Sequence, residues 1–146
     1  LAPSCAPKCD FIFGQALRGV RYMRPIGNPN CPYVPQSVDK KALLDTNEKL
    51  LITEGEKKAL ALVGAGYTAI ALSGIWGWKT RYSSEGTTEP LRELDQLNLK
   101  GRKVYIVFDS DVTTAWKIQQ AEDGLADCLT SKGAEVWCVR IPQSEK

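Results

Sequence analysis

The chain has 146 residues and no histidine, and its 19 Lys and Arg nearly balance its 17 Asp and Glu. This length is that of one domain with a sizeable core, and the near-neutral charge means that any affinity for a polyanion is local. Without imidazole there is no Ser-His-Asp triad, Cys-His pair or His-containing zinc site, so chemistry depends on carboxylates, lysines, hydroxyls, thiols or a bound metal. No apolar run approaches the roughly 20 residues that span a bilayer, and we expect no membrane partner.

Five cysteines cannot all pair within the chain, which favours a reducing, cytoplasmic environment. Cys5, Cys9 and Cys31 offer three of the four ligands that a structural zinc site normally uses. A zinc site here would need a fourth ligand from elsewhere, and because the sequence does not begin with methionine we expect a piece of a longer protein. Cys128 and Cys138 occupy apolar positions of a predicted helix and a predicted strand, so we expect both to be buried.

The composition changes near residue 47. Residues 1–46 hold six of the eight prolines and carry 6 Lys and Arg against 3 Asp, a net charge of +3. Prolines and turn dipeptides at this density interrupt helices and strands. We therefore predict an irregular basic N-terminal arm over 1–46, with one short strand near 16–23, followed by an α/β domain over 47–146.

Apolar runs of strand length alternate with helical stretches from residue 47 onward. In chain order we predict a strand at 50–53, a helix at 55–63, a strand at 68–72, a loop at 73–89, a helix at 90–97, a strand at 103–108, a helix at 113–131 and a strand at 135–141. Strands with continuous apolar runs, separated by helices, indicate a mainly parallel sheet of about four strands flanked by helices.

Acidic residues follow two of these strands. Glu54 comes directly after the first strand, and Asp109 and Asp111 come directly after the third. Ligands of open α/β sheets bind outside the carboxyl ends of the strands, so we expect the three carboxylates to converge there. Converging carboxylates need a cation or a proton between them, and an oxygen-only ligand set favours Mg2+ or Mn2+. The alternative is that these acids only cap helices and turns.

Basic residues near these acids are candidates for phosphate binding. Lys57 and Lys58 lie in the first turn of the predicted helix at 55–63, where a helix N-terminus also favours anions. Arg21 and Arg24 in the predicted arm either contact phosphates or pair with surface acids.

The loop at 73–89 contains two tryptophans followed by basic residues. Trp76 and Trp78 either stack on bases, as aromatic side chains do in single-strand-binding proteins, or pack over the edge of the sheet. Lys79 and Arg81 would lie beside such bases.

Three other motif interpretations fit less well. Residues 64–69 match G-x-G-x-x-A but follow a helix and precede a strand, the reverse of a dinucleotide-binding turn. A calcium loop that starts at Asp109 would have glycine at its sixth position and glutamate at its twelfth, but this sequence has Thr114 and Gln120 there. Residues 109–113 also resemble the DxDxT motif of haloacid-dehalogenase-type phosphatases, but only 33 residues remain for the downstream Lys and acids of that family.

Three longer runs resemble one known family. They are LITEGEKKA at 51–59, AIALSGIWGW at 69–78 and KVYIVFDSD at 103–111. Together they resemble the Toprim-like domain of replication proteins, often primase–helicases, that plasmids, phages and other mobile elements carry. The stretch at 21–25 with Asn28-Pro29 also resembles the segment before that domain, so the resemblance spans about 18–142.

The resemblance implies a Toprim-like fold and a role for each matching acid. Glu54 would assist proton transfer or the metal, and Asp109 and Asp111 would hold Mg2+ for primase-type nucleotidyl transfer on nucleic acid, with single-stranded DNA and nucleotides as partners. A helicase or other replication module would belong to the same full-length chain. The alternatives are a non-catalytic module that binds nucleic acid or a partner, and a nuclease of the overcoming-lysogenisation-defect type.

Overall fold

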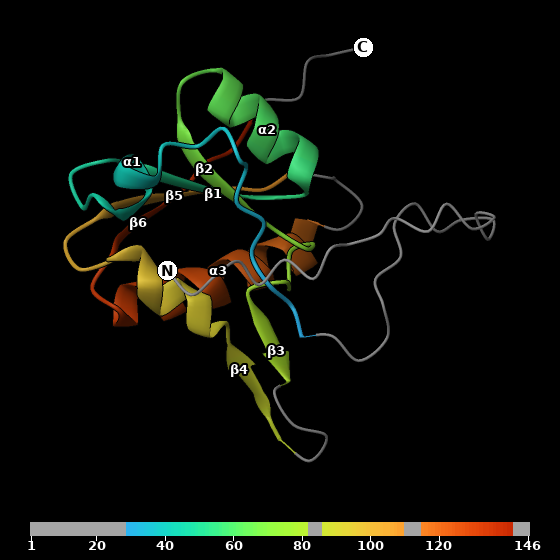
Figure 1. The fold of residues 1–146 in the computed structure, drawn as a ribbon. Coiled ribbons are helices and arrows are strands. Elements are labelled where there is room, and N and C mark those ends of the chain that lie inside the picture. The colour runs from blue at the N-terminus through green and yellow to red at the C-terminus, as the bar shows by residue number, and fades with distance from the viewer. Residues whose placement is uncertain (1–28, 82–85, 110–114, 142–146) are drawn as a thin grey trace, which may run out of the picture.

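A four-stranded parallel sheet forms the centre of the computed structural model, which describes residues 29–81, 86–109 and 115–141. The strands, in the spatial order β2-β1-β5-β6, are β1 (Leu50–Glu54), β2 (Thr68–Leu72), β5 (Lys103–Val107) and β6 (Glu135–Cys138). The helices are α1 (Lys40–Leu44), α2 (Glu56–Gly64), α3 (Ala115–Ser131) and the 3-10 helix η1 (Arg92–Leu97). A hairpin of β3 (Lys79–Arg81) and β4 (Thr88–Pro90) projects from one side (Figure 1).

The predicted fold class is confirmed. The four strands predicted within residues 47–146 are all present, and each pair of neighbours in the sheet is parallel. The apolar runs that predicted them are buried because helices cover both faces of the sheet, and every residue of β2 is buried. This α/β arrangement is consistent with a Toprim-like fold. Among the described residues, no helix has the length and apolar character needed to cross a membrane.

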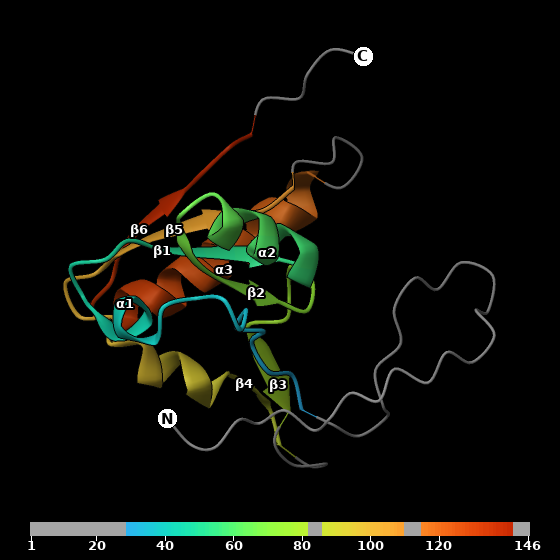
Figure 2. The ribbon, with the colours of Figure 1, turned by 45° about the horizontal axis from the view of Figure 1, so that its top comes forward.

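The chain winds outward from the centre of the sheet in two directions. The unit β1-α2-β2 moves to one side of β1, and the unit β5-α3-β6 moves to the other side of β5. Since strand–helix–strand crossovers are right-handed, opposite directions put the two helices on opposite faces, with α2 in front of the sheet and α3 behind it (Figure 2). The strand order therefore reverses between β1 and β5, where open α/β sheets bind their ligands.

Part of the predicted arm is ordered structure. The five-residue helix α1, too short to show a periodic pattern, places Leu43 in the core, and Asp39 caps it by accepting a hydrogen bond from the Lys41 N–H at 2.9 Å. Tyr33 forms an antiparallel bridge with Ala71 at the edge of β2. Residues 1–28, and with them the strand predicted at 16–23, lie outside the described residues.

The predicted loop at 73–89 and helix at 90–97 differ from the structure. The loop contains the β3–β4 hairpin, whose three-residue strands are too short for an alternating pattern to reveal. Pro90 pairs with Lys79 at the end of β4 rather than starting a helix, and η1 begins only at Arg92. Pro90 is tolerated there because a terminal strand residue need not donate a hydrogen bond.

The two C-terminal cysteines are less buried than we predicted. On α3 the buried face continues from Leu125 to Leu129, which leaves Cys128 only half-buried. Cys138 is exposed because it ends β6, an edge strand that no further strand covers within the described part of the chain.

Arg102 joins three segments from inside the protein. Its guanidinium is fully buried and donates hydrogen bonds to the carbonyl oxygens of Ala42, Leu43, Glu48 and Leu97, at 2.6 to 3.0 Å. These carbonyls belong to α1, the turn before β1, and η1. Because a buried carbonyl needs a donor, this one side chain fixes both short helices against the start of β5.

We expect Arg102→Met to lower the free energy of unfolding by about 3 kcal/mol or more, because several buried carbonyls lose their donor. Urea unfolding followed by circular dichroism measures this change. Lys103→Met, one residue away and exposed, is the control and should change it by less than about 0.5 kcal/mol. An Arg102→Met variant as stable as the unmodified chain would contradict the assigned role.

Candidate metal centre

Two of the predicted acids lie together at the point where the strand order reverses. Glu54 ends β1, and Asp109 follows β5 by two residues. The two strands pair in parallel with Thr53 opposite Val107, so both carboxylates emerge at the same edge of the sheet. The buried hydroxyl of Thr53 also donates to the Val107 carbonyl at 2.8 Å, which holds the two strand ends together.

Hydrogen bonds and one lysine connect these acids. The backbone N–H of Asp109 donates to Glu54 Oε1 at 3.1 Å. Lys58 Nζ lies 2.9 Å from Glu54 Oε1 and 2.7 Å from Asp109 Oδ2. The ammonium group thus contacts both carboxylates, and the predicted convergence of Glu54 and Asp109 is observed.

Gly55 brings the lysine back over the acids. Its φ of +80° belongs to the left-handed region that glycine adopts at little cost, and its N–H donates to the Leu72 carbonyl at 3.0 Å. This single residue turns the chain from β1 into α2, so that Lys58, four residues after Glu54, lies in the first turn of the helix above it. Gly55, directly after Glu54, therefore serves to place Lys58 beside the two acids.

The electrostatics of the site favour a cation between the two acids. Burial alone would lower the pKa of Lys58, but its hydrogen bonds to Asp109 and Glu54 and their negative charges together outweigh burial and raise the pKa above its ordinary value of 10.5. Lys58 therefore stays protonated near neutral pH. The Glu54 side chain is only 18% exposed, so its negative charge is poorly screened by water and attracts a neighbouring cation.

The structure describes only one of the four predicted site residues considered next. Lys57 is exposed on α2 beside Lys58. Asp111, Arg21 and Arg24 lie outside the described residues. Within the described ranges no group of three or more potential metal ligands occurs, and the acidic pair at this edge contributes two carboxylates.

The structure describes only one of the three cysteines considered for a zinc site. Cys5 and Cys9 lie outside the described residues, and Cys31 is half-buried. Its thiol donates to the Pro32 carbonyl at 3.5 Å. The zinc site stays a prediction.

The two tryptophans have different environments. Trp78 is 8% exposed and packs on α3, where its Cζ2 lies 3.0 Å from the position that a Cβ on Gly124 would occupy. Trp76 is 40% exposed. Lys79 Nζ lies 4.7 Å from the Trp76 ring centroid and 5.1 Å from that of Trp78. Trp78 thus fits the packing interpretation, whereas Trp76 and Lys79 offer an aromatic and cationic surface.

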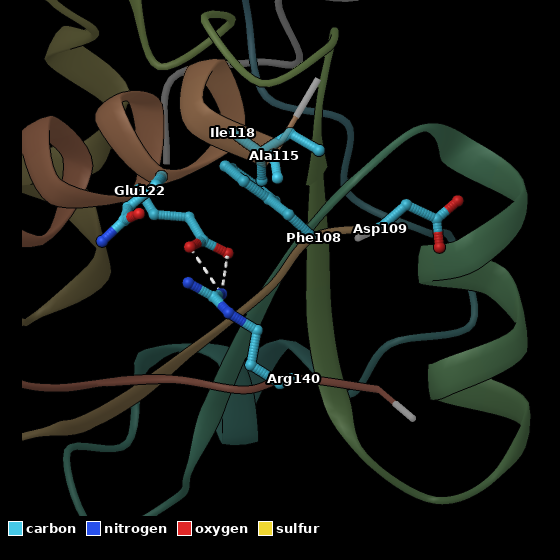
Figure 3. Close-up of a pocket in the computed structure, with 7 residues that line it drawn as sticks. Phe108, Asp109, Ala115, Ile118, Glu122 and Arg140 are labelled. Carbon is cyan, nitrogen blue, oxygen red and sulfur yellow. Dashed lines mark hydrogen bonds and ion pairs between the residues drawn. The ribbon is translucent and has the colours of Figure 1, made fainter. Parts of the chain in front are cut away.

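A cleft of about 110 Å3 beside Asp109 contains two charged residues that sequence reasoning missed. Glu122 from α3 and Arg140 beyond β6 form an ion pair there, with Arg140 Nη1 2.6 and 2.5 Å from the two carboxylate oxygens (Figure 3). One signal was present: Glu122 lies four residues after Ile118 on the apolar face of the helix, where a charged residue is unusual.

Comparison with known proteins places the chain in a family. Residues 41–146 match the family described as Domain of unknown function (DUF3854). The chain belongs to the DUF3854 family. An uncharacterized protein of Picosynechococcus sp. (strain ATCC 27264 / PCC 7002 / PR-6) is 44% identical in an alignment of 107 residues. The alignment covers 66% of this chain and 10% of that protein. The chain thus spans about a tenth of this relative's length. The region that matches the family model, 41–146, includes Glu54, Lys58 and Asp109.

The role of Lys58 in this DUF3854 protein predicts a pH-dependent stability. Because its pKa is higher in the folded chain, Lys58 should stabilise the fold fully below pH 10.5 and lose this contribution as the pH rises through the raised value. We expect the difference in unfolding free energy between the unmodified chain and Lys58→Met to be constant from neutral pH to 10.5 and to shrink as the pH rises further. Urea unfolding across the pH range, in EDTA, measures it.

Lys57→Met is the matched control, since Lys57 is the exposed neighbour on the same helical turn. It should show a small difference with no such decline. A Lys58→Met difference that stays flat through the alkaline range would contradict the bridging role of Lys58.

Proposed function

We propose that this chain is the Mg2+-dependent, Toprim-like domain of a cytoplasmic DNA replication protein, and that it transfers nucleotides on nucleic acid in the manner of a primase. The observation that supports this most is the convergence of Glu54 and Asp109 around one ammonium group at the reversal of strand order. The order of the motifs, strand-Glu-Gly and then strand-Asp-x-Asp, is the one that the resemblance to Toprim domains implies.

The residues at this edge fit a hard divalent cation. Both ligating groups are carboxylates, and they lie close enough together to contact the same ammonium group at 2.9 and 2.7 Å. Glu54, Asp109 and, from its place in the sequence, Asp111 would hold Mg2+ or Mn2+. When bound, the ion would neutralise phosphate oxygens and stabilise the attacking and leaving oxygens.

The chain's own groups have separable tasks. In the described part of the chain, both hydrogen bonds of the Glu54 carboxylate end on Oε1, and so we assign Oε2 to accept a proton from a substrate hydroxyl. The bond from the Asp109 N–H to Oε1 orients the chain after β5. Lys58 stays protonated and can exchange a carboxylate for a phosphate oxygen, and Lys57 adds positive charge next to it.

Nucleic acid would approach along the loop after β2. That loop begins at the carboxyl end of β2, at the same edge of the sheet as Glu54, because β1 and β2 are parallel with Glu54 opposite Leu72. Trp76 is exposed enough to stack on a base, and Lys79 lies beside it to pair with a phosphate. Single-stranded DNA and nucleotides are the partners that this surface suits, and the greater length of the relative leaves room for a helicase or other replication module.

We expect Glu54→Gln and Asp109→Asn each to remove the heat of Mg2+ binding and to reduce metal-dependent nucleotide addition on a single-stranded template by about 100-fold or more. Calorimetry and a primer-synthesis assay measure the two effects, and circular dichroism checks the fold. Asp127→Asn, an exposed carboxylate on α3, is the control and should behave like the unmodified chain.

Other outcomes identify the alternatives. Full activity in either variant would refute the proposal. Metal-dependent nicking of a plasmid without synthesis would indicate a nuclease, and DNA binding without any carboxylate-dependent heat would indicate a non-catalytic module.

We expect oligo(dT) to quench the tryptophan fluorescence of the chain, and Trp76→Ala to lose most of this quenching and about tenfold in affinity, because one base loses its stacking partner. A fluorescence titration measures both. Trp137→Ala is the control, since Trp137 is exposed on β6. Equal quenching and affinity in Trp76→Ala would rule out base stacking at this position.

A further inference from the structure

The ion pair between Glu122 and Arg140 lies beside the candidate metal centre but has no part in it. Both residues line the cleft that Asp109 also lines. In Figure 3 the Asp109 carboxylate turns toward α2, whereas the guanidinium of Arg140 lies on the other side of Phe108. The cleft therefore has one acid of the metal centre on one flank and a cationic group on the other.

A buried ion pair is not by itself a strong source of stability. The Glu122 side chain is 1% exposed on α3, between the buried residues Ala121 and Leu125. Burying a carboxylate is unfavourable before it is paired, and well-packed apolar residues of similar volume are often as stable as a buried ion pair. What the pair specifically achieves is to hold a guanidinium at a fixed place in the cleft.

Arg140 has the position and the chemistry to bind an anion. Its side chain is 54% exposed, and the contact with Glu122 uses Nη1, whereas a guanidinium has further donors on Nε and Nη2. A planar fork of donors matches phosphate oxygens better than a lysine ammonium does. Arg140 also follows the end of β6 by two residues, so it lies at the same edge of the parallel sheet as Glu54 and Asp109.

We propose that Arg140 binds a phosphate group of the substrate in the cleft beside Asp109, and that Glu122 is the positioning residue that holds it. The identity of the substrate as a nucleotide or nucleic acid rests on the proposed function, but the binding of phosphate does not. The phosphate comes from the triphosphate of a nucleotide or from the backbone of a DNA strand, and the two sources are separable by experiment.

The test measures binding of inorganic tripolyphosphate and, separately, of an oligo(dT) without terminal phosphates, both by calorimetry in EDTA. We expect Arg140→Ala to weaken binding of one of them by about tenfold or more, since a charge-assisted pair is lost, and Arg140→Lys to weaken it less. Lys103→Ala removes one positive charge at the opposite end of β5 and should leave both affinities unchanged. Loss of tripolyphosphate binding points to the nucleotide, and loss of oligo(dT) binding points to the strand.

A second variant guards against misfolding, because Arg140→Ala leaves the Glu122 charge buried without its partner. Glu122→Gln/Arg140→Gln removes both charges, and we expect it to unfold at about the temperature of the unmodified chain yet to bind as weakly as Arg140→Ala. Unchanged affinity for both probes in this folded variant, or an unmodified chain that binds neither, overturns the proposal.

A different measurement, the heat of Mg2+ binding, tests the proposed function separately from the phosphate site. In Glu54→Gln we expect the heat of Mg2+ binding to disappear, while tripolyphosphate binding in EDTA remains. If the unmodified chain gave no Mg2+ heat but lost phosphate binding with Arg140, the metal centre would be refuted and the phosphate site would stand.

Discussion

The parallel pairing of β1 with β5 is the constraint on which the acidic edge of this protein depends. It brings the ends of two strands that lie more than fifty residues apart in the chain to the same edge, and the bond from Thr53 to the Val107 carbonyl holds those ends together. The bond from the Asp109 N–H to Glu54 then orients one acid against the other. Because the strand order reverses between β1 and β5, both acids lie at the position where open α/β sheets bind their ligands.

Each of the three acids Glu54, Asp109 and Glu122 has a cationic partner at this edge. Lys58 pairs with both Glu54 and Asp109, and Arg140 pairs with Glu122. A metal ion could take the place of Lys58 between Glu54 and Asp109 and free its ammonium for a phosphate. Arg140 could bind a phosphate through Nε and Nη2 while Nη1 keeps its contact with Glu122, so that the buried Glu122 charge stays paired. The groups that pair with the acids at this edge are therefore the ones that would contact the substrate.

Short-range patterns in the sequence predict the sheet and the acidic pair well. Apolar runs such as 50–53 and 68–72 mark buried strands, and the acids directly after them lie where parallel strands put them. Contacts that depend on distant parts of the chain are missed. Nothing near Arg102 shows that it binds the carbonyls of α1 and η1, and nothing near Arg140 shows that it meets Glu122 across the cleft. The short hairpin and α1 are missed because three to five residues carry too little pattern.

The most direct test of the central claim, a divalent cation site made by Glu54 and Asp109, is an NMR titration with Mn2+. A paramagnetic ion broadens the signals of nuclei close to where it binds. We expect the backbone amide signals of Glu54, Gly55 and Asp109 to broaden first, at substoichiometric Mn2+, and excess Mg2+ to restore them. Broadening that begins instead at exposed acids on α3, such as Asp123 and Asp127, with these three amides unaffected, would contradict it.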